Sequence, residues 1–280
     1  MQKTGTIVAA LQEILAAQNL AVLVTVIEAT NGVGAKLLVT EDGTITGTLG
    51  NAVWDAALAG HAPGFLATRA EARTYQLSEI LPQADATVRV LCERIEPEPR
   101  LLICGAGHVG AALARLALVL QYHTTLIDDR ATFVTRERFP DVRLNLVAAE
   151  SWTHAIETGG GTGRGLSVAV VTRGHNEDEE CLRAVLSLRP DYVGMIGSRR
   201  RTNIVLERLR QTGFSKTQVN VVRAPVGLDI GAVSPEEVAL AILAEIVAER
   251  RGGTGSPLSA WRRPVAENTP GRLSEASSLT

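Results

Sequence analysis

The stretch Leu-Leu-Ile-Cys-Gly-Ala-Gly-His-Val-Gly at residues 101–110 decides how this chain folds. It begins as a short apolar strand, turns sharply on glycine, and continues over 108–120 with apolar residues at helical spacing. A second apolar strand over 124–127 follows and ends in two aspartates. A bare Gly-x-Gly-x-x-Gly pattern is a weak signal. Strand, glycine turn, helix, strand and acid in this order predict a phosphate-binding unit of the dinucleotide type.

The three glycines of this turn have separate physical tasks. We expect Gly105 to permit the tight turn, Gly107 to let a ligand approach the backbone, and Gly110 to let helix and strand pack closely. The helix N-terminus adds unpaired N–H groups and a partial positive charge. Asp128 stands where a ribose hydroxyl would be held. The residues predicted to bind a cofactor here are Gly105, Ala106, Gly107, His108, Val109, Gly110, Asp128, Asp129 and Arg130.

The composition limits the class of protein. The 280 residues, 45% hydrophobic and 21% charged, are enough for two ordinary globular domains. A net charge of −2 gives no general attraction to nucleic acid or to anionic lipid. No apolar run in the sequence is long enough to cross a bilayer, and the first residues do not resemble a signal peptide. We therefore expect a cytoplasmic protein without nucleic-acid or membrane partners.

Metal and nucleophile chemistry has no signature in this sequence. The three cysteines, Cys92, Cys104 and Cys181, are too few and too scattered for a disulfide framework or a zinc site. Two of them lie in predicted strands and one lies on a predicted helix. At such positions we interpret each cysteine as a small buried hydrophobic residue and not as a reactive thiol. The sequence therefore predicts no metal site and identifies no catalytic residue.

The Glu-Pro-Glu-Pro segment at 96–99 divides the chain, because two prolines alternating with acids cannot continue a strand. Before it, short strands, helices and an Asp-Gly hairpin turn at 42–43 indicate a small α+β domain. After it, strands and helices alternate, which indicates an α/β fold with a Rossmann-like, doubly wound parallel sheet. We expect an N-terminal α+β domain over 1–96, a linker over 97–100, a Rossmann-like cofactor-binding domain over 101–252 and a flexible tail over 253–280.

The expected elements follow from apolar periodicity and turn signals. In the first domain they are helices over 6–18 and 52–58, and strands over 22–27, 36–40, 44–47 and 88–95. In the second domain the expected strands are 101–104, 124–127, 144–147, 167–171, 192–196 and one near 219–222. The expected helices there are 108–120, 177–188, 199–211 and 235–250.

The loop after the strand over 167–171 carries polar residues at the edge where open α/β sheets bind ligands. We expect Asn176 to cap the helix that follows. That arrangement leaves Arg173 and His175 on the loop, facing the crevice. The residues predicted to bind the cofactor from this loop are Thr172, Arg173 and His175.

The loop after the strand over 192–196 ends in a run of arginines. Cations near a helix N-terminus oppose the helix dipole, and a bound phosphate or carboxylate would reverse that effect. We therefore expect Ser198 and Arg199 to bind an anion and Arg201 to lie on a solvated face. The residues predicted to bind the cofactor from this loop are Gly197, Ser198, Arg199 and Arg200.

Taken together, these motifs resemble the XdhC/CoxI family, the accessory proteins of xanthine dehydrogenase and related molybdenum hydroxylases. The resemblance is densest over residues 101–252 and is thinner in the N-terminal half, where it covers 24–28 and 34–39. The motifs that carry it are Gly-Ala-Gly-His-Val-Gly at 105–110, Asp-Asp-Arg at 128–130, Thr-Arg-Gly-His at 172–175, Ile-Gly-Ser-Arg-Arg at 196–200, and the segment 225–231 ahead of Ser-Pro-Glu-Glu at 234–237.

The resemblance implies a chaperone-like role rather than catalysis. Such proteins bind the molybdenum cofactor, promote its sulfuration with a cysteine desulfurase and hand it to an apo molybdenum hydroxylase. They are typically cytoplasmic homodimers. A molybdopterin-type cofactor that carries a phosphate or a nucleotide would suit a pocket made of a glycine turn and arginines.

The N-terminal half departs from the family pattern at two places. The family has Gly-Gly-Cys-Val-Glu where this chain has Gly-Asn-Ala-Val-Trp-Asp at 50–55, around Val53. It has Cys-Gly-Gly where this chain has Ala-Asp-Ala at 84–86, starting at Ala84. If the family's thiols handle sulfur or molybdenum, this chain does not do so in the usual way.

Two other functions stay open at this point. An NAD(P)-dependent oxidoreductase would use the same glycine turn and Asp128, with Arg130 able to meet a 2′-phosphate. Only His108 and His175 are candidates for proton transfer beside a hydride site. A nucleotide-binding regulatory scaffold would use the same pocket without any chemical change.

Overall fold

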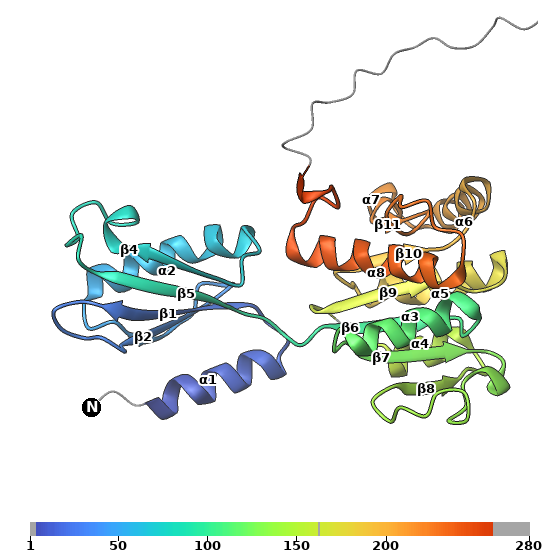
Figure 1. Cartoon of the computed structure of the whole chain (residues 1–280), viewed down its shortest axis with the longest axis horizontal. Coiled ribbons are helices and arrows are strands. Elements are labelled where there is room, and N and C mark those ends of the chain that lie inside the picture. The colour runs from blue at the N-terminus through green and yellow to red at the C-terminus, as the bar shows by residue number, and fades with distance from the viewer. Residues whose placement is uncertain (1–3, 162, 260–280) are drawn as a thin grey trace, which may run out of the picture.

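Two β-sheets, each with its own helices, make up the chain (Figure 1). The computed structural model describes residues 4–161 and 163–259. An antiparallel sheet forms from residues 21–95, and a parallel sheet begins at residue 100. The segment 96–99, with neither helix nor strand, connects the two. We call residues 4–95 the N-terminal half and residues 100–251 the C-terminal half.

The N-terminal half contains one sheet and two long helices. Its elements are α1 (Thr4–Ala16), β1 (Ala21–Glu28), β2 (Lys36–Thr40), β3 (Ile45–Thr48), α2 (Ala52–Ala67), β4 (Ala72–Gln76), the 3-10 turn η1 (Leu77–Glu79) and β5 (Arg89–Ile95). The strand order is β3-β2-β1-β5-β4, and neighbouring strands are antiparallel. Val22, Val24 and Val26 alternate along β1 and share a core with Leu58 and Phe65 of α2. This half is therefore α+β, as predicted.

The C-terminal half is a six-stranded parallel sheet in the order β11-β10-β9-β6-β7-β8. Its strands are β6 (Arg100–Cys104), β7 (His123–Asp128), β8 (Asn145–Ala148), β9 (Leu166–Val170), β10 (Tyr192–Met195) and β11 (Val222–Arg223). Its helices are α3 (His108–Val119), the 3-10 turn η2 (Ala131–Phe133), α4 (Trp152–Gly159), α5 (His175–Ser187), α6 (Arg199–Gln211), α7 (Lys216–Asn220) and α8 (Pro235–Arg251). The predicted Rossmann-like α/β fold is confirmed.

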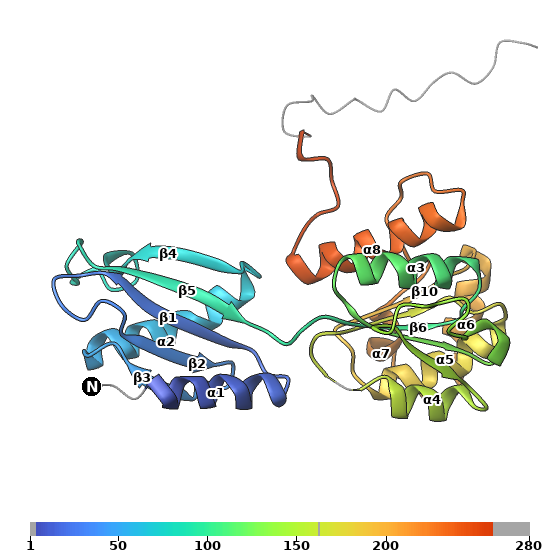
Figure 2. The same ribbon diagram turned by 60° about the horizontal axis from the view of Figure 1, so that its bottom comes forward.

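Helices cover both faces of the parallel sheet (Figure 2). Leu101 and Ile103 of β6 enter the core beneath α3 and α8. Leu102 and Cys104 enter the core beneath α4, α5 and α6. A strand buried on both faces has apolar residues at every position, which explains the continuous apolar run in the sequence.

Several predicted elements differ from the structure. Strand β4 and helix α4 were not predicted, and α2 runs to Ala67 instead of ending at 58. The strand expected near 219–222 is present but displaced, because α7 occupies 216–220 and β11 follows at 222–223. The cap of α5 is Gly174, so His175 lies in the first helical turn and not on the loop. Of the tail predicted over 253–280, residues 260–280 lie outside the described part of the chain.

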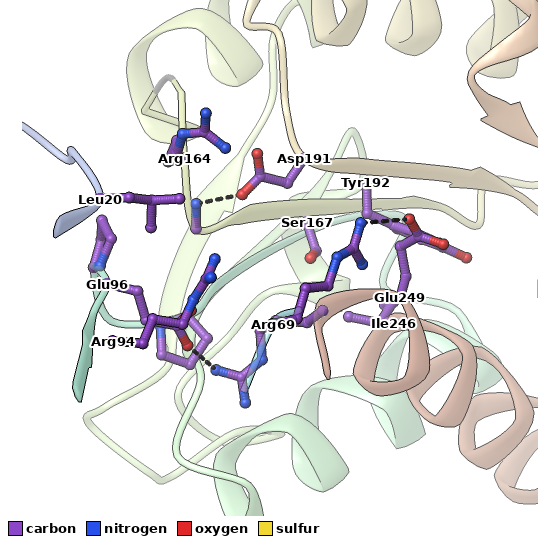
Figure 3. A pocket seen from close by; sticks show the side chains of 14 residues that line it. Leu20, Arg69, Arg94, Glu96, Arg164, Ser167, Asp191, Tyr192, Ile246 and Glu249 are labelled. Atoms are coloured by element: carbon purple, nitrogen blue, oxygen red, sulfur yellow. Dashed lines mark hydrogen bonds and ion pairs between the residues drawn. The ribbon is translucent and has the colours of Figure 1, made fainter. Parts of the chain in front are cut away.

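Ion pairs connect the two halves, and Figure 3 shows the one between Arg69 and Glu249. Arg69 lies 3.5 Å from Glu249, Arg251 lies 2.5 Å from Glu71, and Arg164 pairs with Glu41. Arg69, Arg164 and Glu249 also line a cavity of about 150 Å³ at the amino edge of the parallel sheet. Each hydrophobic cluster of the described residues belongs to one half alone.

Candidate functional site

A cavity of about 530 Å³ opens at the carboxyl edge of the parallel sheet, beyond the ends of β6, β7 and β9. The strand order reverses here, because the chain passes from β6 to β7 on one side and later places β9 on the other. Open α/β sheets bind ligands at such a point. The residues that line this carboxyl-edge cavity are Gly105, Gly107, His108, Val109, Asp128, Asp129, Arg130, Phe133, Trp152, Val171, Thr172, Arg173, Glu177, Ile196, Gly197, Arg201 and Pro235.

The glycine turn after β6 has the geometry predicted for Gly105 and Gly110. Gly105 has φ +117°, and a Cβ there would lie 2.6 Å from the carbonyl oxygen of Val171. A Cβ on Gly110 would lie 1.8 Å from the carbonyl oxygen of Gly105, so only glycine allows α3 to approach the turn. A Cβ on Gly107 would meet nothing within 4 Å. Two glycines therefore serve the fold, and Gly107 faces free space at the cavity.

The first turn of α3 points its backbone N–H groups toward the cavity. Gly107 is the N-cap and offers no side chain, and the first turn of α3 contains no acid. By contrast, the side chain of Ser198 caps α6 by accepting from the N–H of Arg201 at 3.2 Å. Among the described residues no side chain caps the positive end of α3, where Gly107, His108 and Val109 line the cavity. This is a favourable place for a phosphate.

Asp128 has a different environment from the one expected of a ribose-binding acid. It is 1% exposed, and its Oδ2 accepts from the N–H of Ala106 at 2.6 Å and from Nη2 of Arg130 at 2.9 Å. Its Oδ1 accepts from the backbone N–H and the Nε of Arg130 at 2.9 and 2.8 Å. Burial alone would raise the pKa of Asp128, but these hydrogen bonds outweigh burial and lower it. The four bonds use the acceptor positions of the carboxylate, which fixes the glycine turn against β7.

Arg130 and Arg173 bring guanidinium groups to the cavity. Arg130 is held by Asp128, and its Cζ lies 3.6 Å from the ring centroid of Phe133. Nη2 of Arg173 lies 2.6 Å from Oδ2 of Asp129, and its Nε lies 3.6 Å from Oε1 of Glu177. Both guanidinium groups therefore face carboxylates of the chain itself.

Arg201 is not on the solvated face that was expected. Its Nε and Nη2 donate to Oδ2 of Asp178 at 2.8 and 2.5 Å, and the side chain of Asp178 is fully buried. Thr172 Oγ1 donates to the other carboxylate oxygen at 2.5 Å. Burial raises the pKa of Asp178, against the opposing effect of Thr172 and Arg201. The pair ties the start of α6 to the first turn of α5, and Nη2 of Arg201 also donates to the carbonyl oxygen of Thr172 on the loop after β9 at 3.3 Å. Arg201 and Thr172 form part of the cavity wall.

The predicted site residues divide into two groups. Ten of them line the carboxyl-edge cavity: Gly105, Gly107, His108, Val109, Asp128, Asp129, Arg130, Thr172, Arg173 and Gly197. The other six do not line it: Ala106, Gly110, His175, Ser198, Arg199 and Arg200. Ala106 and Gly110 serve the turn, Ser198 caps α6, and Arg199 and Arg200 are exposed.

Several residues that line the cavity were not predicted from the sequence. Phe133 and Trp152 lie in short elements that carry no strong periodic pattern. Arg201 could have been recognised, because a serine cap at 198 places the residue three positions later against the helix start. Glu177 and Pro235 come from the first turns of α5 and α8.

No thiol lines the carboxyl-edge cavity, and all three cysteines are buried. Burial raises the pKa of Cys92 to about 12 and also raises that of Cys181. Within residues 4–161 and 163–259, no group of three or more His, Cys, Asp or Glu side chains could hold a metal ion. None of the helices in these two ranges has the length and apolar character needed to cross a membrane.

Comparisons with known proteins match both halves. A model described as the XdhC Rossmann domain matches residues 101–246, more than half of the chain, and a model of the XdhC and CoxI family matches residues 14–76. The chain is 19% identical to a crystal structure titled as a xanthine dehydrogenase from Bacillus halodurans, with a TM-score of 0.48, covering 91% of this chain and 99% of that one.

Three curated relatives were found, and the chain spans less than half the length of each. It is 29% identical to the uncharacterized protein YqeB of Escherichia coli (strain K12), over 79% of this chain and 41% of that protein. It is 30% identical to a probable xanthine dehydrogenase subunit of Bacillus subtilis (strain 168), over 61% and 49%. It is 33% identical to the molybdenum cofactor insertion chaperone PaoD of E. coli, over 27% and 24%. The match of the Rossmann-domain model over most of the C-terminal half, with the second model in the N-terminal half, shows that the chain belongs to the XdhC/CoxI family.

Proposed function

We propose that this chain is a maturation factor for a xanthine dehydrogenase-type molybdenum hydroxylase. It holds a phosphate-bearing cofactor, the molybdenum cofactor or its dinucleotide form, and delivers it to the apo-hydroxylase. Family membership and a relative named as a molybdenum cofactor insertion chaperone support this role. A cysteine desulfurase partner and a homodimeric state are expected from the family and belong to the same proposal.

The observation that carries the proposal is the uncapped positive end of α3 facing the 530 Å³ carboxyl-edge cavity. Backbone N–H groups at a helix start bind phosphate without any charged side chain, and the helix dipole adds to the attraction. The N–H groups at 107–109 would hold a phosphate of the cofactor. The guanidinium group of Arg173, whose partner Asp129 is partly exposed, would hold further negative charge.

The residues at the cavity suit binding of the cofactor more than chemistry on it. The molybdenum centre supplies its chemistry after it reaches the hydroxylase. The described residues offer no exposed thiol, and the stretches around Val53 and Ala84 carry none where the family has cysteine. We therefore assign this chain the task of holding and protecting the cofactor, and no sulfur-carrying step.

Copurification of pterin with the protein tests this proposal. The full chain is isolated from cells that make molybdenum cofactor, and bound molybdopterin is oxidised to a fluorescent pterin and measured. We expect pterin with the wild type and a loss of at least tenfold in Gly107→Val. That variant should fold normally, since a Cβ at Gly107 meets no atom within 4 Å. Absence of pterin from freshly isolated wild-type protein would contradict the proposal.

An NAD(P)-dependent oxidoreductase receives less support. The acid that would hold the adenosine ribose, Asp128, already accepts four hydrogen bonds from Ala106 and Arg130. Titration with NADH and NADPH, followed by absorbance, separates this alternative: we expect neither tight binding nor turnover. A regulatory scaffold that binds a nucleotide alone would bind the nucleotide but copurify without pterin.

A further inference from the structure

An ion pair joins two sides of the carboxyl-edge cavity. Asp129 follows the end of β7, and Arg173 lies on the loop after β9. Strand β6 and its glycine turn lie between these two strands in the sheet. The 2.6 Å contact between Arg173 and Asp129 therefore spans the end of β6, on the side where α3 begins.

Arg173 is bound on two sides by acids of its own chain. Glu177, on the first turn of α5, lies 3.6 Å from its Nε, and Asp129 holds its Nη2. All three residues line the cavity. The side chain of Arg173 is 49% exposed and that of Asp129 is 30% exposed, so the pair is partly hydrated and inexpensive to separate.

The two other arginines that line the cavity are held more firmly. Arg201 pairs with Asp178, which is fully buried, and Arg130 forms three hydrogen bonds with Asp128, which is also buried. An incoming anion would have to break a buried ion pair to recruit either of them completely. Arg173 is the cation whose partner is easiest to exchange.

We propose that Asp129 acts as a removable competitor: in the ligand-free protein it occupies Arg173, and a polyanionic ligand displaces it. This inference rests on the proposed function, because it assumes that the anion binds at the start of α3. In the bound state the guanidinium of Arg173 pairs with the phosphate, and Asp129 turns to solvent. This exchange at Arg173 favours ligands with more than one negative charge, since such a ligand can outcompete the single carboxylate of Asp129.

The proposal reverses the ordinary expectation for an acid at this position. If Asp129 held a ribose hydroxyl, its loss would weaken binding. If Asp129 competes for Arg173, neutralising it strengthens binding. An exposed ion pair contributes little, so freeing Arg173 by Asp129→Asn should tighten binding about three- to fivefold, and the removed negative charge adds a smaller gain.

Calorimetric titration of the full chain with inorganic pyrophosphate provides the test. The four proteins are the wild type, Asp129→Asn, Arg173→Gln and the double variant. We expect tighter binding in Asp129→Asn, weaker binding in Arg173→Gln, and a clearly smaller gain from Asp129→Asn when Arg173 is already absent. Asp141→Asn is the matched control, because it makes the same charge change and frees Arg143 from a comparable surface pair away from the cavity; its affinity should not change.

Each result distinguishes the competitor from the alternatives. A gain of full size in the double variant would mean that Asp129 acts by its charge or through Arg130, whose Nε lies 3.8 Å from Oδ1 of Asp129, and not by competing for Arg173, which overturns the exchange. Weaker binding in Asp129→Asn would make Asp129 a ligand contact and also overturn it. Binding by the wild type without a gain in Asp129→Asn removes this inference alone. No binding by any of the four proteins removes the proposed site at α3 as well.

Discussion

Arginine–carboxylate pairs occur at both edges of the parallel sheet, but they have different roles there. At the amino edge, Arg69 and Glu249 help to close the contact with the N-terminal half around a cavity of about 150 Å³. At the carboxyl edge, arginine–carboxylate pairs surround a cavity of about 530 Å³. The difference lies in the backbone, because only the carboxyl edge presents the uncapped start of a long helix.

Arginines alone therefore do not identify an anion site in this chain. Guanidinium groups that are already paired with carboxylates attract a further anion only weakly. Backbone N–H groups at an uncapped helix start have no such partner and still attract an anion. The glycine turn is what distinguishes the carboxyl edge. Substitutions at each edge should therefore differ in their effects on unfolding and on ligand binding.

Gly110→Ala should have the largest effect, because it attacks the feature found at only one of these edges. The new Cβ would lie 1.8 Å from the carbonyl oxygen of Gly105, a backbone atom that cannot move without disturbing the turn. We expect a loss of more than about 3 kcal/mol in the free energy of unfolding, beyond ordinary overpacking. Denaturant unfolding measures it. Gly107→Ala is the control, and an equal loss there would show that the two glycines do not differ as described.

Arg201→Met tests the wall of the carboxyl-edge cavity. It leaves the fully buried carboxylate of Asp178 without its cation. Removing one partner of a buried pair is strongly destabilising, and we expect about 3 kcal/mol, the lower end for such pairs, since Arg201 is 22% exposed. The double variant Arg201→Met/Asp178→Asn should recover most of this loss. Thermal unfolding that is unchanged in the single variant would contradict the assignment.

Asp128→Asn tests how the glycine turn is held. The folded pKa of Asp128 is lowered from 3.8, so its ionised form contributes stability that is present above that value and is lost as pH falls through the folded pKa. We expect a loss of about 2 kcal/mol at pH 7, the size for hydrogen bonds to a charged group. Melting temperatures from pH 7 to pH 3 should show the variant and the wild type converging below about pH 3.8. A constant difference across that range would argue against ionised Asp128 as the cause.

Glu249→Gln tests the amino edge and should have the smallest effect. Its side chain is 35% exposed and its partners Arg69 and Arg223 are more exposed still. Pairs of this kind contribute less than about 1 kcal/mol. We expect little change in unfolding and none in the pterin that copurifies. A loss of pterin would mean that the two edges are not independent.

The fold could be predicted where one pattern dominated. The strands from β6 to β10 and the helices α3, α5, α6 and α8 all lie within two residues of their predicted bounds. β4 was not predicted because Tyr75 is its one buried residue, so its sequence shows no alternation of apolar and polar residues. α2 was predicted too short because Gly60, Pro63 and Gly64 interrupt its pattern, although Ala62, Phe65 and Leu66 still bury one face.

The site could be predicted only as far as local sequence determines it. The glycine turn was readable because backbone geometry requires glycine at fixed spacing. Which arginine of the run at 199–201 faces the cavity depends on the phase of α6 and on Asp178, a residue of another helix. The occupation of Asp128 by Arg130 and Ala106 depends on side-chain geometry that spacing does not encode.

The strand order also determines how late in synthesis the residues around the carboxyl-edge cavity are all present. The ribosome makes β6, β7 and β8 before the chain returns to place β9 on the other side of β6. The wall with Thr172 and Arg173 is thus translated late, and Pro235 is the last residue to reach the cavity. A nascent chain that ends before Pro235 consequently lacks part of the cavity wall, and a ligand that needs the complete wall can bind only after residue 235 has been translated.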